Sequence, residues 1–285
     1  MKIPKSLLPL IEDGIVDNVV SQLMSGKEAT VYVVQCGDEL RCAKVYKEVH
    51  KRSFKNAAQY QEGRKVRNSR RARAMSKGSK FGKSEQESAW KNTEVDALYK
   101  LHAAGVRVPA PYGCFNGVLI MDLILDEDGN VAPRLNDVGM SADQAHEDYL
   151  EMIGHVQNML CCGLIHGDLS EFNVLVDAYG PVIIDLPQVV DASANNNAQR
   201  MLMRDIRNMT NYYAQFCPSI VNYKFGQEMW ALFEKGELTP DVDLSGQFKE
   251  DTNNANVTEV LQEIIAAQLQ EEEKRARING DVEEY

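Results

Sequence analysis

The sequence contains no apolar run that approaches the ~18–20 residues needed to cross a bilayer. Its start, Met1-Lys2-Ile3-Pro4, lacks the apolar stretch and small-residue cleavage site of a secretory signal. With 9 prolines and 19 glycines among 285 residues, the composition excludes collagen-like and low-complexity chains. We therefore expect a globular, cytoplasmic protein with no membrane partner.

A cysteine-based framework is also missing. The six cysteines include no C-x-x-C pair and no partnering histidine cluster, so neither disulfides nor a zinc site are predicted. Free cysteine is among the most buried residue types, and we expect these six to be buried. They are Cys36, Cys42, Cys114, Cys161, Cys162 and Cys217.

Charge is distributed unevenly along the chain. The net charge is −11, yet residues 47–91 carry 14 Lys and Arg against four acids, which leaves 17 basic against 38 acidic residues elsewhere. A concentrated cationic segment can bind phosphate oxygens and release counterions. The 47–91 segment is therefore a candidate contact for RNA or a ribosomal particle, with a solvated loop as the alternative.

The first part of the chain has the pattern of a small antiparallel sheet. β-Branched and aromatic residues gather at 19–24, 30–34 and 40–46, with turn residues between them. A short helical lead-in over 7–20 is expected before the first strand. This pattern predicts three antiparallel strands.

A long interruption follows the third strand. Residues 48–88 lose apolar periodicity and are rich in Arg, Lys, Ser and Gly, which predicts a flexible insertion. Helical spacing then predicts a helix over 88–103, which ends before Gly105. The apolar run 118–121 predicts a buried strand, and the turn at 126–130 is expected to separate two lobes.

The second half of the sequence is predicted to be mostly helical. Ser141 is a plausible N-cap for a long core helix that ends near Cys162. Further helices are expected over 201–216 and 257–269. The residues expected on the buried face of the long helix are Leu150, Ile153, Val156 and Leu160.

The run HGDLSEFN places Asp168 five residues before Asn173, and Asp185 follows Asn173 by 12 residues. A hairpin of strands at 174–176 and 182–184 would bring Asn173 and Asp185 side by side. Their side-chain oxygens suit Mg²⁺ bound against phosphates, and Asp168 is then free to orient an attacking hydroxyl. This arrangement indicates phosphoryl transfer.

Lys44 lies in an apolar strand, where burying an ammonium without a partner is costly. A carboxylate is therefore expected beside it, and Glu94 on the following helix is the candidate. A strand lysine paired with a helix glutamate is how protein kinases hold the α- and β-phosphates.

With these motifs in place, the chain resembles the RIO family of atypical serine/threonine protein kinases. The matching runs are SGKEATVY, HGDLSEFN and IDLPQ, and the resemblance that they carry covers residues 15–190. The resemblance implies an α+β, two-lobed kinase-like fold without the usual substrate-docking subdomains. It divides the chain into a small β-rich N-terminal lobe with one main helix (1–125) and a mostly helical C-terminal lobe (126–285).

The resemblance also implies a role for each site residue. Asp168 would be the catalytic aspartate, with Asn173 and Asp185 as ligands of Mg²⁺ or Mn²⁺. The residues implied in binding ATP are Ser25, Gly26, Lys27 and Glu28 over the triphosphate, the pair Lys44 and Glu94, and the hinge residues Met121, Asp122 and Ile124 at the adenine.

The implied activity is ATP-dependent transfer to protein hydroxyls of an unknown substrate, with autophosphorylation. The nucleotide loop is neither a kinase G-x-G-x-x-G loop nor a Walker A motif, and no Ala-Pro-Glu follows Asp185.

Two alternatives stay open. One is an ATPase-type assembly factor for RNA–protein particles, and the other is a small-molecule phosphotransferase of aminoglycoside or choline kinase type.

Overall fold

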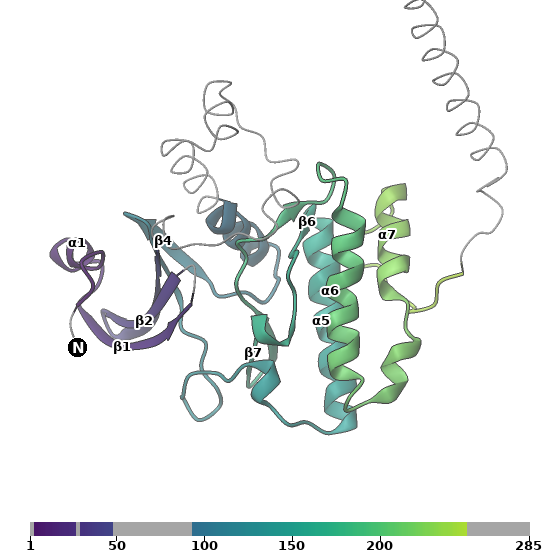
Figure 1. The fold of residues 1–285 in the computed structure, drawn as a ribbon, viewed down its shortest axis with the longest axis horizontal. Helices are drawn as coiled ribbons and strands as arrows, with labels where there is room; N and C mark the ends of the chain where they lie inside the picture. The colour runs from purple at the N-terminus through teal and green to yellow at the C-terminus, as the bar shows by residue number, and fades with distance from the viewer. Residues whose placement is uncertain (1–2, 27–28, 48–92, 250–285) are drawn as a thin grey trace, which may run out of the picture. The chain divides into compact units, whose positions relative to one another are not determined.

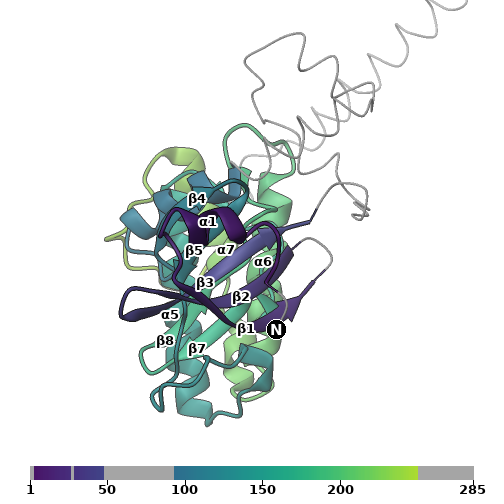
Figure 2. The same cartoon turned by 90° about the vertical axis from the view of Figure 1, so that its left-hand side faces the viewer.

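A five-stranded antiparallel sheet forms the first half of the fold, in a computed structural model that describes residues 3–26, 29–47 and 93–249. The strand order is β1-β2-β3-β5-β4, and Figure 2 labels all five strands. The three strands predicted at the start and the strand predicted at 118–121 are confirmed, whereas β4 was not predicted. The strands are β1 (Asn18–Ser25), β2 (Ala29–Cys36), β3 (Glu39–Tyr46), β4 (Pro111–Phe115) and β5 (Val118–Asp122).

Several predicted features lie outside the described residues. They are Lys27, Glu28, the insertion over 48–88, the start of the predicted helix over 88–92, and the helix over 257–269. The described part of the helix before Gly105 covers 93–103.

The described residues up to Gln247 belong to one compact unit. The division into lobes at 125/126 stays a prediction. In the described ranges, no helix is long and apolar enough to cross a membrane.

The short helix α1 (Leu8–Glu12) packs on the sheet, because Leu7 and Leu10 are buried in a small core with Val34 and Val118. The helix is shorter than the predicted lead-in. It ends at Glu12, and Gly14 then adopts a left-handed backbone (φ +69°) that turns the chain toward β1.

Three helices dominate the second half: α5 (Ala142–Cys161), α6 (Ala198–Tyr213) and α7 (Phe225–Lys235). Contacts join each of them to the other two, and Figure 1 shows them side by side. Ser141 caps α5 as predicted, since its side chain accepts a hydrogen bond from the backbone N–H of Gln144. α7 was not predicted.

One residue of the predicted buried face of α5 is wrong. Ile153, Val156 and Leu160 are buried, whereas Leu150 is 41% exposed. Consecutive helical residues are rotated by about 100°, so Leu150 is turned away from the stripe on which its neighbour Tyr149 is buried.

Two short antiparallel strand pairs lie between α5 and α6 in the sequence. β6 (Leu164–Ile165) pairs with β9 (Val190–Asp191), and β7 (Val174–Asp177) pairs with β8 (Gly180–Ile183). The β7–β8 hairpin confirms the prediction. Short 3₁₀ turns complete the fold at η2 (Leu135–Asp137), η3 (Glu171–Asn173) and η4 (Pro218–Asn222).

No disulfide joins any of the six cysteines, all of which lie among the described residues, and the expectation that they are buried is wrong for five of them. Only Cys42 is buried, and Cys114 is exposed because it lies on the short strand β4 with its side chain away from the core. The burial of these cysteines depends on where each lies in its strand or helix, and it differs from the average burial of free cysteine in proteins.

The two leucines of α5 give a matched test of this packing. We expect Leu160→Ala to lower the free energy of unfolding by ~2–5 kcal/mol, because it removes a fully buried side chain. Leu150→Ala on the exposed face is the control, with a loss below about 1 kcal/mol. Urea unfolding measures both, and equal losses would contradict the assignment of the buried face.

Candidate functional site

The 166–173 loop, which carries HGDLSEFN, is held by α6. The carboxylate of Asp205 accepts hydrogen bonds from the backbone N–H groups of Gly167 (2.7 Å) and Leu169 (3.3 Å). Asn208, one turn further along α6, donates to the carbonyl of Leu169 (2.9 Å). Asp205 is 1% exposed, and this burial raises its pKa to about 6. These bonds fix the backbone on both sides of Asp168.

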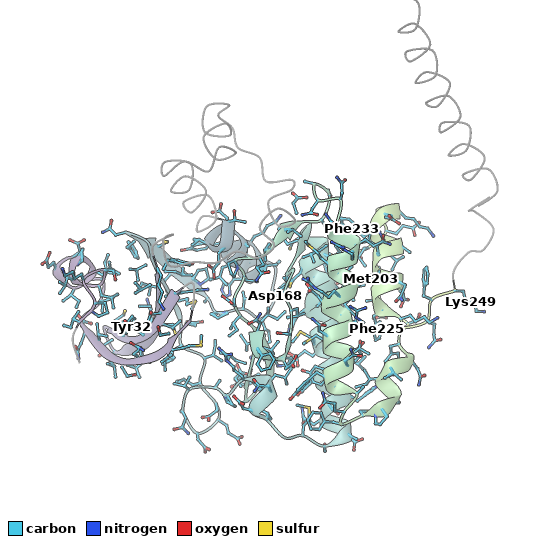
Figure 3. All side chains as sticks on the ribbon, viewed as in Figure 1. Tyr32, Asp168, Met203, Phe225, Phe233 and Lys249 are labelled. Carbon is cyan, nitrogen blue, oxygen red and sulfur yellow. The ribbon has the colours of Figure 1, made fainter. Side chains whose placement is uncertain are left out.

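Asp168 itself is exposed, in the region between the sheet and helices α5 and α6 (Figure 3). Gln188 donates a hydrogen bond from Nε2 to its Oδ2 (3.0 Å), and Asn173 donates to its backbone carbonyl (2.9 Å). Burial raises the pKa of the Asp168 carboxyl, and the bond from Gln188 opposes that rise. The side chain is therefore a carboxylate held in one orientation with a face open to solvent.

The β7–β8 hairpin brings Asn173 close to Asp185. Val174 pairs with Ile183, and the backbone N–H of Ile184 donates to the carbonyl of Asn173 (3.0 Å). Asp185 follows directly, with a left-handed backbone (φ +66°) that is uncommon for a residue other than glycine. Such conformations gather at functional sites.

Lys44 joins three separate segments of the fold. Its Nζ lies 2.5 Å from Oε1 of Glu94 and 2.8 Å from Oδ1 of Asp185. Tyr46 donates to the second oxygen of Glu94 (2.7 Å). The predicted pairing of Lys44 with Glu94 is present, and Asp185 is a second carboxylate partner.

The charges of this cluster stabilise each other. Burial would lower the pKa of Lys44, which is 8% exposed, but Glu94 and Asp185 raise the pKa well above its usual value. The protein around Asp185 would raise the pKa of that carboxyl, whereas the charge of Lys44 and its hydrogen bond hold the pKa below its usual value. The side chain of Asp185 is 47% exposed, so it also faces solvent.

The oxygen atoms near Asp185 fit a magnesium ion. The side-chain nitrogen of Asn173 donates to the carbonyl of Asp168, so the side-chain oxygen of Asn173 is available to a metal ion. Lys44 contacts only Oδ1 of Asp185, which leaves Oδ2 available as well. Mg²⁺ in proteins is commonly held by one or two carboxylates together with phosphate oxygens and water. Across the described ranges no group of three or more His, Cys, Asp or Glu could hold a metal unaided. The remaining ligands would come from a bound nucleotide and water.

The hinge residues Met121 and Asp122 end β5, and Ile124 follows it. The N–H of Asp122 donates to the carbonyl of Ala110 (2.9 Å), and its carboxylate accepts from the hydroxyl of Tyr112 (2.5 Å). The side chain of Asp122 is therefore used inside the sheet. Met121 pairs with Cys42 of β3. The carbonyl of Ile124 accepts from Ala132, whereas its N–H has no backbone partner within the described residues. That N–H is available to a ligand.

Ser25 ends β1, and Gly26 follows it. The N–H of Gly26 donates to the carbonyl of Ala29 (2.9 Å), which closes the turn into β2. Lys47 at the end of β3 donates to Oγ of Ser25 (3.0 Å) and to the carbonyl of Gly26 (2.5 Å). Two of the four predicted loop residues are thus placed beside β3, and Lys27 and Glu28 lie outside the described residues.

Three contributors to the site were missed by the sequence analysis. Gln188 and Asp205 contact the 166–173 loop, and Tyr46 contacts Glu94. Asp205 gave one usable signal, because it is the only acidic residue in the sequence of α6 and sits among the apolar residues of its buried face. Gln188 ends the IDLPQ run, and Tyr46 follows Lys44 by two residues and so shares its face of the strand, although neither was assigned a role.

Comparison with protein families matches residues 30–225 to the RIO domain. The chain is 32% identical over 210 residues to the RIO-type serine/threonine-protein kinase Rio1 of Haloferax volcanii, covering 73% of this chain and 67% of that protein. It is 29% identical over 220 residues to the serine/threonine-protein kinase RIO1 of Homo sapiens, covering 76% of this chain and 37% of the human protein. The chain thus spans about two thirds of the first relative and well under half of the second.

A solved structure gives the same fold. The Rio2 kinase of Chaetomium thermophilum, in an ADP/Mg²⁺-phosphoaspartate complex, is 21% identical, with a TM-score of 0.51. The match covers 75% of this chain and 65% of that one. At 21% identity the similarity is evidence for the fold alone, and it confirms the predicted α+β kinase-like architecture.

The contact between Gln188 and Asp168 can be tested directly. Gln188→Met removes the donor to the carboxylate, so the pKa of Asp168 is expected to rise and less of the group is ionised at a given pH. Titration of the carboxyl carbon by NMR measures the shift. Gln215→Met, at an exposed position just beyond α6, is the matched control. An unchanged Asp168 titration in Gln188→Met would contradict the orienting role.

Proposed function

This chain belongs to the RIO family of atypical protein kinases, and on that premise we propose that it is an ATP-dependent serine/threonine protein kinase. It transfers the γ-phosphate to protein hydroxyls, its own included. The observation that carries the proposal is Lys44, which lies between Glu94 and Asp185 next to the loop of Asp168. Relatives that are serine/threonine-protein kinases by name support it.

In this proposal each side chain has one task. Lys44 binds phosphate oxygens of ATP and is itself oriented by Glu94. The free N–H of Ile124 and the neighbouring backbone of Asp122 bind adenine. Ser25 and Gly26, with Lys27 and Glu28, cover the triphosphate.

Transfer takes place at Asp168. Its carboxylate, oriented by Gln188, accepts the hydrogen bond of the substrate hydroxyl and receives its proton as the phosphate is transferred. Asn173 and Asp185 would hold Mg²⁺ through their free oxygens. When bound, the ion neutralises charge on the phosphates.

Other expectations from the sequence remain predictions. They are autophosphorylation, binding of RNA or a ribosomal particle by residues 47–91, and a cytoplasmic location. Of the 47–91 segment only Lys47 is among the described residues. No contact among the described residues favours ATP hydrolysis or transfer to a small molecule over transfer to protein. The assay below therefore treats these two alternatives as possible outcomes.

The test is to measure transfer of labelled phosphate from ATP to added protein, to small amines and alcohols, and to water. The proposal expects protein to be the preferred acceptor. Asp168→Asn should lower the turnover by a factor of ~10²–10⁴, because the proton acceptor is lost, and should leave ATP affinity within about twofold.

Asp143→Asn, at an exposed position in the first turn of α5, controls for the loss of a surface charge. Equal losses of ATP affinity and turnover in Asp168→Asn would show that Asp168 binds nucleotide instead. Phosphate transferred mainly to water or to small molecules would replace the proposed activity by one of the two alternatives.

A further inference from the structure

Helix α6 presents a row of arginines. Arg200, Arg204 and Arg207 are separated by four and then three residues, so their side chains leave the helix on one side. The only acid in the helix, Asp205, is buried and bound to the 166–173 loop. The surface of the helix on this side is therefore cationic.

This arginine face adjoins the loop of Asp168. Arg204 donates to the carbonyl of Gly167, the residue before Asp168. Asn208, which faces the loop from the same helix, donates to the carbonyl of Leu169, the residue after Asp168. Burial raises the pKa of Asp168, and the charge of Arg204 opposes the rise, so the helix and the carboxylate are within electrostatic reach.

Arg200 and Arg207 are exposed and have no carboxylate partner anywhere in residues 3–26, 29–47 and 93–249. Within these residues Arg200 donates a hydrogen bond to the side chain of Asn197 (3.0 Å). Elsewhere Arg41 and Arg107 pair with Glu39 and Asp177.

Outside residues 47–91 the chain has 38 acids against 17 bases. Within the described residues, Arg200 and Arg207 lie without an ion pair about one turn on either side of Arg204, which bonds the loop of Asp168.

From this placement we infer that Arg200 and Arg207 select acidic protein substrates, by binding Asp or Glu side chains that flank the hydroxyl presented to Asp168. The inference rests on the proposed kinase function and names its substrate class. A short acidic peptide suits two isolated cations. A nucleic acid would bring many phosphates against a largely acidic chain, which disfavours it.

The experiment compares two peptides of equal length that share one serine, flanked by glutamates in one and by alanines in the other. The wild-type chain is expected to have a higher kcat/KM for the glutamate peptide, and added salt should reduce the difference. The double variant Arg200→Gln/Arg207→Gln should lower kcat/KM for the glutamate peptide by roughly fivefold to tenfold. The alanine peptide should change by less than about twofold, within the scatter of exposed substitutions.

Lys5→Gln is the matched control, because Lys5 is an exposed base just before α1 on the sheet side of the fold. It should change neither peptide. The inference is wrong, while the kinase function stands, if the wild type phosphorylates both peptides equally. The same holds if kcat/KM of the double variant falls equally for both peptides. If the wild type turns over ATP but phosphorylates neither, the kinase function fails, and the inference fails with it.

Adding a single-stranded RNA oligonucleotide to the alanine-peptide assay tests whether the arginines bind RNA instead of an acidic peptide. The inference expects equal inhibition, or none, in wild type and double variant. Inhibition of the wild type alone would assign the arginine face to RNA and overturn the inference.

Discussion

The buried ammonium of Lys44 is the interaction on which the arrangement of the site depends. An unpaired charge at this position would cost several kcal/mol, and two carboxylates offset that cost. Because Lys44 lies on β3, Glu94 on the helix over 93–103 and Asp185 after β8, the ion pairs tie the sheet to the segment that follows the hairpin. Tyr46 binds the oxygen of Glu94 that Lys44 leaves free. Such a cluster gives little net stability by comparison with apolar packing, so its value is geometric.

A second buried charge performs the same task for the other half of the site. Asp205 holds the backbone of Gly167 and Leu169, and the pKa of about 6 reflects what its burial costs. That cost grows as the pH rises from the usual carboxyl range toward 6, since the ionised form is the one disfavoured in the folded chain. The two N–H donors recover part of it. Both halves of the site therefore use a charge inside the protein to fix groups that face solvent.

The sequence predicted the parts of the site whose geometry is local. Asn173 and Asp185 flank one short hairpin, so their proximity follows from strand pairing, and Lys44 required a carboxylate because its strand is apolar. The contacts of Gln188 and Asp205 with the 166–173 loop come from tertiary packing across 20 and 38 residues, which no local pattern records. Strands of two residues, such as β6, are too short to show a period. Leu150 was placed on the wrong face because its apolar side chain was taken as a sign of burial, whereas it is the one large apolar residue of α5 that is exposed.

The most direct test of the role of Lys44 is a crystal structure with a non-hydrolysable ATP analogue and Mg²⁺. The account predicts that Lys44 keeps Glu94 and places Nζ within ~3.5 Å of a phosphate oxygen. It also predicts that Asp185 gives up its contact with Lys44 and faces the metal. The account would be contradicted by a bound nucleotide whose phosphates lie away from Lys44, with the ion pair between Lys44 and Asp185 still closed.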